Sequence, residues 1–117
     1  MEKQNVIVEK SFQFALRIIE FCELLEEHKK YVIARQLLKS GTSIGANVRE
    51  GQGAESRADF IHKLKIAIKE AEETEYWLLL CKHSKNYPFD ESLLNDNKEI
   101  LKIINSIITT AKRNTIK

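Results

Sequence analysis

Apolar residues recur three and four positions apart along most of the chain, the spacing that places them on one face of an α-helix. In residues 6–27 two such stripes run side by side, one of Val8, Phe12, Ala15, Ile19 and Cys22, the other of Phe14, Ile18, Phe21 and Leu25. Together they cover about half of the helix circumference, whereas a helix covered on one side needs roughly 100°. We expect this helix either to be covered by its own bundle and a neighbouring subunit, or to lie centrally in its own bundle.

A second helix is expected to follow the polar segment 28–30. Its apolar stripe keeps its phase through a passage rich in glycine and hydroxyl residues, in the order Ala34, Leu37, Gly41, Ile44 and Val48. We predict one unbroken helix, ending where Gly51 adopts a left-handed conformation. Because each internal glycine costs a helix roughly 1 kcal/mol relative to alanine, Gly41 and Gly45 indicate close approach of another backbone. The alternative is a loop over residues 41–45 between two short helices.

The third helix is expected over residues 56–83, after a short turn at residues 51–55. Ser56 and Asp59 have the spacing of a capping box, and the core stripe has a strict rhythm: Phe60, Leu64, Ala67, Ala71, Thr74, Leu78 and Cys81. Asp90 follows the only proline and is the expected cap of a fourth helix over residues 91–113. The sequence therefore predicts an all-α fold, an antiparallel up-down-up-down four-helix bundle, as a single domain over residues 1–117.

Helix 56–83 carries a second apolar row away from its core stripe, which predicts a subunit interface. Projection at 100° per residue places Ile66, Trp77 and Leu80 opposite the core stripe, with Tyr76 at the edge. A row containing tryptophan is unusual on the surface of a monomer. Polar residues of the second helix, which either face solvent or hydrogen-bond across a helix or subunit contact, complete the expected interface: Ser43, Asn47 and Glu50. We expect head-to-tail contact between helix one or two of one subunit and helix three of the next.

Charge is distributed unevenly, although the net charge of +2 is too small to identify a nucleic-acid-binding protein. The first half of helix 56–83 is basic, and its second half is acidic. The two zones lie at separate ends of a helix about 40 Å long. The candidates for nucleic-acid binding are basic residues of the second and third helices: Arg35, Lys39, Arg49, Arg57, Lys63, Lys65 and Lys69. The alternative is that these charges are solvated or only orient subunits.

Catalytic and metal-binding patterns are weak in this chain. The nearest approach to the Glu-x-x-His pairs of di-iron bundles is the segment from Asp59 to His62, where Asp59 is better placed as a cap. The three histidines lie near helix ends or on outer faces, and Cys22 and Cys81 are expected to be buried free thiols. We expect no enzyme activity, metal or cofactor. Without a leader-like or membrane-spanning apolar run, a cytoplasmic setting is expected.

The segment SGTSIGANVREGQGAESRADFIHKLKIAIKEAEETEYWL, together with SFQFALRII near the start, resembles a known family. It is similar to the small bacterial four-helix bundles encoded in intervening sequences of large-subunit ribosomal RNA genes, and it also resembles the accessory variability protein of diversity-generating retroelements. The match is dense from Tyr31 to Leu80. The resemblance implies a cytoplasmic, barrel-shaped homopentamer without established enzyme activity, with nucleic-acid binding in some members. We therefore expect a non-enzymatic homo-oligomeric adaptor for RNA or DNA, with or without a protein partner. The alternative is a structural or protein-interaction scaffold.

Overall fold

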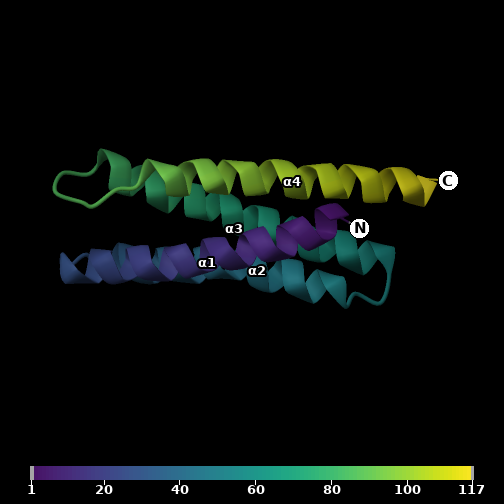
Figure 1. The fold of residues 1–117 in the computed structure, drawn as a ribbon, viewed down its shortest axis with the longest axis horizontal. Coiled ribbons are helices and arrows are strands. Elements are labelled where there is room, and N and C mark those ends of the chain that lie inside the picture. The colour runs from purple at the N-terminus through teal and green to yellow at the C-terminus, as the bar shows by residue number, and fades with distance from the viewer. Residues whose placement is uncertain (1, 117) are drawn as a thin grey trace.

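The computed structural model describes residues 2–116, with side chains from residue 6 to residue 114. Within that range the chain forms four α-helices: α1 (Glu2–Glu27), α2 (Tyr31–Gln52), α3 (Arg57–His83) and α4 (Glu91–Ile116). Successive helices run in opposite directions along a bundle that measures 53 × 21 × 20 Å (Figure 1). The predicted all-α, up-down-up-down four-helix bundle is therefore confirmed.

The two ends of the bundle differ in which connections they hold (Figure 1). The terminal end holds the start of α1, the end of α4 and the α2–α3 connection at residues 53–56. The loop end holds the connections at residues 28–30 and 84–90. α1 and α4 both extend further toward the terminal end than predicted, because apolar spacing marks the buried turns and gives only a lower bound on helix length.

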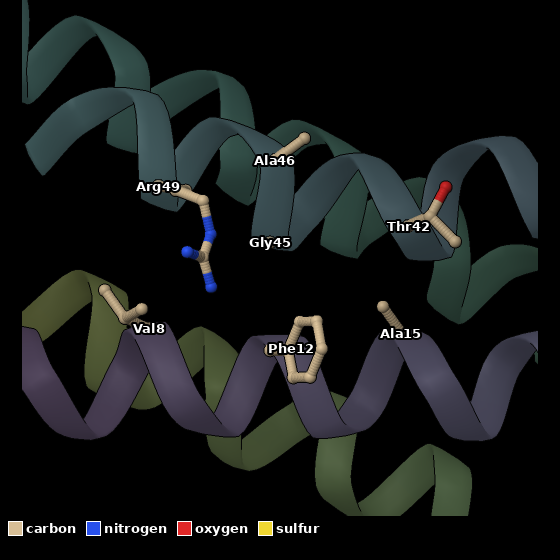
Figure 2. Close-up of a pocket in the computed structure, with 7 residues that line it drawn as sticks. All are labelled: Val8, Phe12, Ala15, Thr42, Gly45, Ala46 and Arg49. Carbon is tan, nitrogen blue, oxygen red and sulfur yellow. The ribbon is translucent and has the colours of Figure 1, made fainter. Parts of the chain in front are cut away.

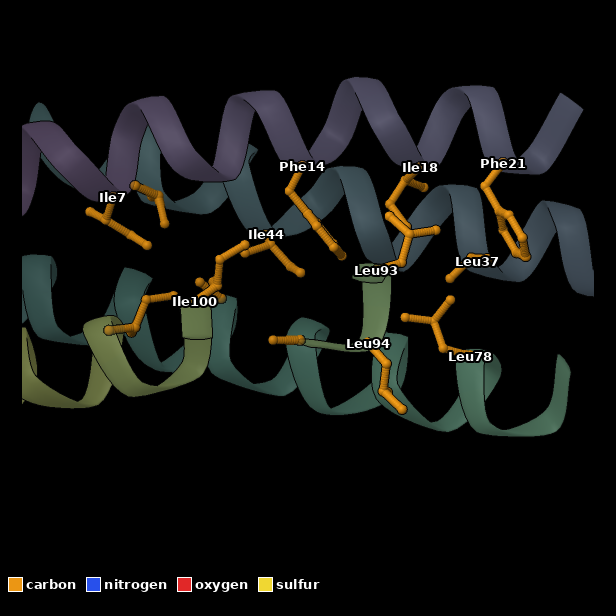
Figure 3. Close-up of a cluster of buried hydrophobic side chains, with 14 of the residues drawn as sticks. Ile7, Phe14, Ile18, Phe21, Leu37, Ile44, Leu78, Leu93, Leu94 and Ile100 are labelled. Carbon is orange, nitrogen blue, oxygen red and sulfur yellow. The ribbon is translucent and has the colours of Figure 1, made fainter. Parts of the chain in front are cut away.

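Apolar side chains from all four helices point into one interior (Figure 3). One of the two stripes predicted for α1 is buried in this interior: Phe14, Ile18, Phe21 and Leu25. Cys22 of the other stripe is buried as well. Phe12 and Ile19 of the other stripe remain exposed. The bundle alone therefore does not cover the apolar arc of α1, and a purely central position for this helix is excluded.

α2 is unbroken through its glycines, so the predicted continuous helix is confirmed and a loop over residues 41–45 is not formed. A Cβ added at Gly41 would lie 2.8 Å from Cγ2 of Ile18, and one at Gly45 would lie 3.2 Å from the carbonyl oxygen of Ser11. The expected close approach to a backbone is thus found at Gly45, where α1 crosses. At Gly41 the space is filled by a buried side chain instead.

The prediction that Gly51 ends α2 in a left-handed conformation is wrong. Gly51 is helical and buried, and α2 continues to Gln52, with Gly53 as its C-cap at a φ of −99°. A Cβ at Gly51 would meet Lys63 and Phe60 of α3 at 3.5 and 3.6 Å, ordinary van der Waals contacts, so this position faces α3 and has room for a small residue. Among the described residues, the left-handed positions are Lys29 and Asn86, with φ of 62° and 64°.

The predicted caps of α3 and α4 are confirmed. The backbone N–H of Asp59 donates to Oγ of Ser56 at 3.0 Å, and the backbone N–H of Ser92 donates to Oδ1 of Asp90 at 2.9 Å. Each bond satisfies a backbone donor that the first turn of a helix leaves without a partner. These caps fix where α3 and α4 begin, and so which side chains each helix presents at the ends of the bundle.

Buried polar contacts set the register of α3 against its neighbours. Oγ1 of Thr74 donates to Oγ of Ser40 in α2 at 2.9 Å, and Nδ2 of Asn97 in α4 donates to the carbonyl oxygen of Ala71 at 2.8 Å. A polar group buried away from water must find a partner, so these contacts oppose sliding of one helix along another. They place the basic first half of α3 beside the end of α2 and the second half of α4.

Candidate oligomer and nucleic-acid interfaces

A groove of about 190 Å³ lies between α1 and α2 on the outside of the bundle (Figure 2). It is lined by Val8, Phe12, Ala15, Thr42, Gly45, Ala46 and Arg49. The guanidinium carbon of Arg49 lies 5.8 Å from the centre of the Phe12 ring, within range of a cation–π contact. Because the backbones approach closely at Gly45, the groove has an apolar floor with a positive charge on one side.

The apolar surface of this groove continues along α1. Phe12, Leu16 and Ile19 expose 46%, 41% and 40% of their surface, and Leu38 of α2 is also exposed. Three large apolar residues on successive turns of one helix form a contiguous patch rather than scattered exposed residues. The predicted interface residues did not include this patch. Its sequence signal was present, however, in the unusually wide apolar arc of residues 6–27.

The apolar row predicted on α3 is less exposed than expected. Ile66, Trp77 and Leu80 are half-buried, and Trp77 packs against the core. Trp77 is thus turned further toward the core than a position opposite the core stripe implies, and a subunit interface formed by this row stays a prediction. Tyr76 is the exposed member at 56%, and its ring meets that of Trp77 edge-on, with 5.2 Å between the ring centroids. Tyr76 is thus the part of the row most accessible to another molecule.

The polar residues predicted for the interface are engaged inside the subunit. Oγ of Ser43 donates to the carbonyl oxygen of Lys39 at 2.6 Å, and Nδ2 of Asn47 donates to that of Ser43 at 2.9 Å. Both bonds stay within α2. Glu50 reaches across to α3, where Lys63 Nζ donates to its carboxylate at 3.2 Å. Any contact of these three residues with another subunit remains a prediction.

The seven predicted nucleic-acid-binding residues do not form one surface. Arg57, Lys63, Lys65 and Lys69 lie together in the first half of α3, near the terminal end. Arg49 lies near the same end but faces α1, over Phe12. The sequence predicts these residues as one site because periodicity identifies the polar side of each helix. It does not show which helix lies beside that polar side.

Arg35 and Lys39 lie at the other end of the molecule, in the first half of α2. There α2 runs beside the acidic half of α3. Burial and the adjacent Glu73 raise the pKa of Glu70, and the positive charge of Lys39 opposes that rise. Lys39 therefore faces an acidic neighbour. The part of the predicted site that the structure brings together is the basic cluster of α3.

The two cysteines contribute packing rather than reactivity. Cys22 and Cys81 are buried free thiols, as predicted. Burial raises the pKa of Cys22 to about 12 and that of Cys81 to about 11, with a smaller contribution to Cys22 from the neighbouring Cys81. The thiolate is the reactive form, so both side chains are inert at neutral pH.

The described residues form neither a metal-binding cluster nor a membrane-spanning helix. No three His, Cys, Asp or Glu side chains in this part of the chain come close enough to hold a metal ion. None of the described helices combines the length and apolar character that crossing a membrane requires.

Comparison with known proteins agrees with this architecture. A crystal structure of a protein of unknown function from the S23 ribosomal protein family of Bacteroides thetaiotaomicron superposes with a TM-score of 0.86 at 51% sequence identity, covering 92% of this chain and 98% of that chain. No curated protein matches significantly. Similarity to the retroelement accessory protein stays a prediction. The sequence model described as 23S rRNA-intervening sequence protein matches residues 3–106. Since that match spans most of the four helices, the chain belongs to the 23S rRNA-intervening sequence protein family.

Proposed function

We propose that this chain is a non-enzymatic, homo-oligomeric adaptor that binds nucleic acid in the cytoplasm. The observation that carries the proposal is the separation of charge along the bundle. In the half toward the terminal end, residues 6–14, 44–69 and 101–114 hold nine Lys or Arg and four Asp or Glu. In the half toward the loop end, residues 15–43 and 70–100 hold eight Lys or Arg and twelve Asp or Glu. The small net charge of the chain is therefore the sum of a positively charged half and a negatively charged half.

This separation favours contact with a polyanion at the terminal end. Phosphates are attracted to the basic half and repelled by the acidic half, so the bundle would approach a nucleic acid in one orientation. The basic residues are mostly exposed, and clustering on one surface matters more for nucleic-acid binding than the sum of all charges. Of the predicted nucleic-acid-binding residues, those in the basic cluster of α3 lie in the half of the bundle that would contact the phosphates.

Assembly of several subunits would strengthen nucleic-acid binding. The exposed apolar patch of α1 and the exposed Tyr76 of α3 belong to the lengths of their helices rather than to the ends of the bundle, so subunits would pack side by side. In a closed ring every subunit is related to the next by rotation, and equivalent ends then lie on the same rim. One rim would be basic and the other acidic. Several weak contacts on one rim would raise the overall affinity for a long nucleic acid. The family resemblance suggests five subunits.

The direct test is binding of fluorescently labelled RNA and DNA at two salt concentrations. We expect saturable binding at 50 mM salt that weakens more than tenfold at 200 mM, because phosphate contacts release counterions. Protein that binds neither nucleic acid at 50 mM salt would refute the proposal. Sedimentation of the same samples would report whether assembly accompanies binding.

A protein-interaction scaffold without nucleic-acid binding is the second candidate. The observation that favours it is the patch of Phe12, Leu16 and Ile19, whose apolar side chains offer nothing to a phosphate. A scaffold would assemble or bind a protein through this patch with little dependence on salt. The two functions therefore predict different outcomes in the same salt series.

A further inference from the structure

The second half of α4 contains only one kind of charge. From Ile100 to Asn114 there is no acidic residue, and the charged side chains are Lys102, Lys112 and Arg113, all of them exposed. The first half of the same helix contains Glu91, Asp96 and Glu99. The change of charge along α4 therefore matches the change along α3, where no acidic residue occurs between Asp59 and Glu70.

These two acid-free segments lie on neighbouring helices, toward the same end of the bundle. α3 and α4 are antiparallel neighbours, tied by the bond from Asn97 to Ala71 and by a 3.1 Å contact between Lys82 and Glu91. Continuing toward the terminal end from these contacts brings residues 57–69 of α3 and residues 101–114 of α4 to the same level along the bundle. Projection at 100° per residue turns several cations to the face that the two helices share, with Lys69 and Arg113 at its edges: Arg57, Lys65, Lys102 and Lys112.

The cations of this surface carry uncompensated charge. The ion pairs formed within the described part of the chain involve Lys10, Arg17, Lys63 and Lys82. None of them uses a cation of the shared α3–α4 face or its edges. By contrast, Lys63 is already held by Glu50. A phosphate approaching the α3–α4 face would therefore meet free cations and would not have to displace a carboxylate.

The spacing of the cations suits a ligand with two backbones. Counted along each helix from the Ala71–Asn97 contact, Lys65, Lys69 and Lys102 form one group, and Arg57, Lys112 and Arg113 form another nearer the terminal end. Ten residues separate Lys102 from Lys112, a rise of about 15 Å along the helix. The major groove of a DNA duplex is about 12 Å wide, so flexible side chains at this separation can reach phosphates on both sides of a groove.

The face lacks the residues that bind unpaired bases. Within residues 57–69 and 101–114 the only Phe, Tyr or Trp is Phe60, which is half-buried and packs against the core. The imidazole of His62 is exposed, but projection places it beyond Lys69, on the side of α3 turned away from α4. Proteins that bind single strands combine a basic groove with exposed aromatic rings on which bases stack. Without such rings, this surface offers charge and shape, which are the features by which double helices are recognised through their backbones.

We propose that the α3–α4 face binds a double helix through its two sugar-phosphate backbones, with Lys102, Lys112 and Arg113 as contact residues. The inference rests on the proposed nucleic-acid-binding function and specifies its ligand and surface. Binding is expected to be independent of base sequence, because backbone contacts carry no sequence information. RNA and DNA duplexes share this chemistry, and they differ in the 2′-hydroxyl and in the shape of their grooves.

The test compares two triple variants with the same change in net charge. One is Lys102→Gln, Lys112→Gln and Arg113→Gln. The matched control is Arg35→Gln, Lys39→Gln and Lys85→Gln, whose cations lie in the loop-end half of the molecule. The probes are a labelled 20-base-pair RNA duplex, the corresponding DNA duplex and one single RNA strand. Circular dichroism would verify that both variants keep their helices.

We expect the wild type to bind a duplex more tightly than the single strand. The α4 variant should lose at least tenfold in affinity, and the slope of log affinity against log salt should fall by about 3, since each phosphate contact contributes about 0.9. The control should stay within about threefold of the wild type, because screening at these salt concentrations limits the reach of distant charges. An RNA duplex bound in preference to DNA would identify recognition of the A-form groove or of its 2′-hydroxyl groups, and equal affinities would identify the phosphates alone.

Three other results would overturn parts of the argument separately. Equal losses of affinity in the α4 variant and the control would exclude the α3–α4 face as the binding site, although the proposed nucleic-acid binding would stand. If the single strand bound more tightly than both duplexes, the double helix would be excluded as the preferred ligand. A wild type that binds none of the three probes at 50 mM salt would refute the proposed function itself.

Discussion

Gly45 of α2 lies against the backbone of Ser11 in α1, so closely that a Cβ at position 45 would be 3.2 Å from the Ser11 carbonyl oxygen and 3.3 Å from its carbon. One turn earlier, a Cβ at Gly41 would be 2.8 and 2.9 Å from two carbons of Ile18. Glycine weakens a helix, so its presence at two positions on one face reflects this contact with α1 rather than local propensity. The contact also shapes the groove beside Phe12.

Alanine at these glycines should destabilise the protein despite its better helix propensity. Alanine gains about 1 kcal/mol of propensity, whereas overpacking costs about 1–3 kcal/mol, so we expect net losses of about 2 kcal/mol for Gly41→Ala and about 1 kcal/mol for Gly45→Ala. The larger loss falls at Gly41 because Ile18 is fully buried and its branched side chain has few alternative rotamers. Urea unfolding at a fixed protein concentration would measure both values.

Gly53→Ala is the matched control for this pair. A Cβ there would meet only the carbonyl oxygen of Glu50, at an unstrained 3.9 Å, and its φ of −99° suits any residue. Restricting the unfolded chain should then stabilise the protein by about 0.5 kcal/mol. Three stabilising substitutions would mean that contact between α1 and α2 does not require glycine.

Lys29 ends α1 in a left-handed conformation that an L-residue with a side chain adopts only at a cost. Its N–H donates to the carbonyl oxygen of Glu26, and that of Lys30 donates to Leu25, both at 2.8 Å, the pattern in which glycine is preferred. We expect Lys29→Gly to stabilise the protein by about 1 kcal/mol in thermal unfolding, because the conformation costs other residues about 1–2 kcal/mol. Lys29→Ala removes the side chain but retains the strain, so it should change stability little. Equal effects of both substitutions would contradict this explanation.

Asp90 couples the start of α4 to pH. Its hydrogen bond from the Ser92 hydroxyl lowers the pKa of the carboxyl below its ordinary value of 3.8, burial opposes this, and the Ser92 backbone N–H and Arg17 add to the lowering. A depressed pKa means that the carboxylate stabilises the folded state above pH 3.8, and that this stability is lost as the pH falls through the folded value. Ser92→Ala should therefore raise the pKa of Asp90 and move acid unfolding to higher pH.

The measurement for Asp90 is a titration of its carboxyl carbon by NMR. Ser84→Ala is a suitable control, because Ser84 is an exposed cap residue whose backbone N–H, rather than its side chain, forms the capping bond to Leu80. It should leave the titration of Asp90 unchanged. If Ser92→Ala also leaves it unchanged, then Arg17 and Asp96, which pair beside Asp90, determine its charge instead.

The helices could be predicted from the sequence because helical periodicity is local. The stripe from Ala34 to Val48 keeps its phase whatever packs on it, and the caps at Ser56 and Asp90 need only the first turn of a helix. The end of α2 was mispredicted because Gly51 could serve either as a left-handed cap or as a small residue against α3. Only the position of Phe60 and Lys63 across the interface decides between these two roles.

The candidate sites were predicted in part for a related reason. Periodicity identifies the polar side of each helix, but the order of helices around the bundle decides which polar sides combine into one surface. Arg49 and Lys63 were therefore grouped, although one faces Phe12 and the other pairs with Glu50. Lys102 was omitted because its significance depends on α3 being its neighbour.

The last prediction concerns assembly through unlike faces, Phe12 on α1 and Tyr76 on α3. Both are exposed, so Phe12→Glu and Tyr76→Glu should each leave the fold intact. Trp77 is a poorer probe, because it packs on the core and its loss would also cost stability. In a head-to-tail ring each subunit uses one face of each kind, so either variant alone should sediment as a monomer with an unchanged helical signal. Asn95→Glu on the exposed side of α4 adds the same charge and should assemble like the wild type.

Mixing the two variants gives the decisive result. A Phe12→Glu subunit keeps its α3 face and a Tyr76→Glu subunit keeps its α1 face, so the mixture can form one native contact and no more. We expect a heterodimer in sedimentation velocity, although neither variant associates alone. If one patch met an identical patch instead, the variant that keeps this patch unchanged would assemble on its own, and mixing would yield no such complementation. A mixture that remains monomeric would therefore exclude contact between the Phe12 and Tyr76 faces, and a wild type that is itself monomeric at micromolar concentration would exclude assembly altogether.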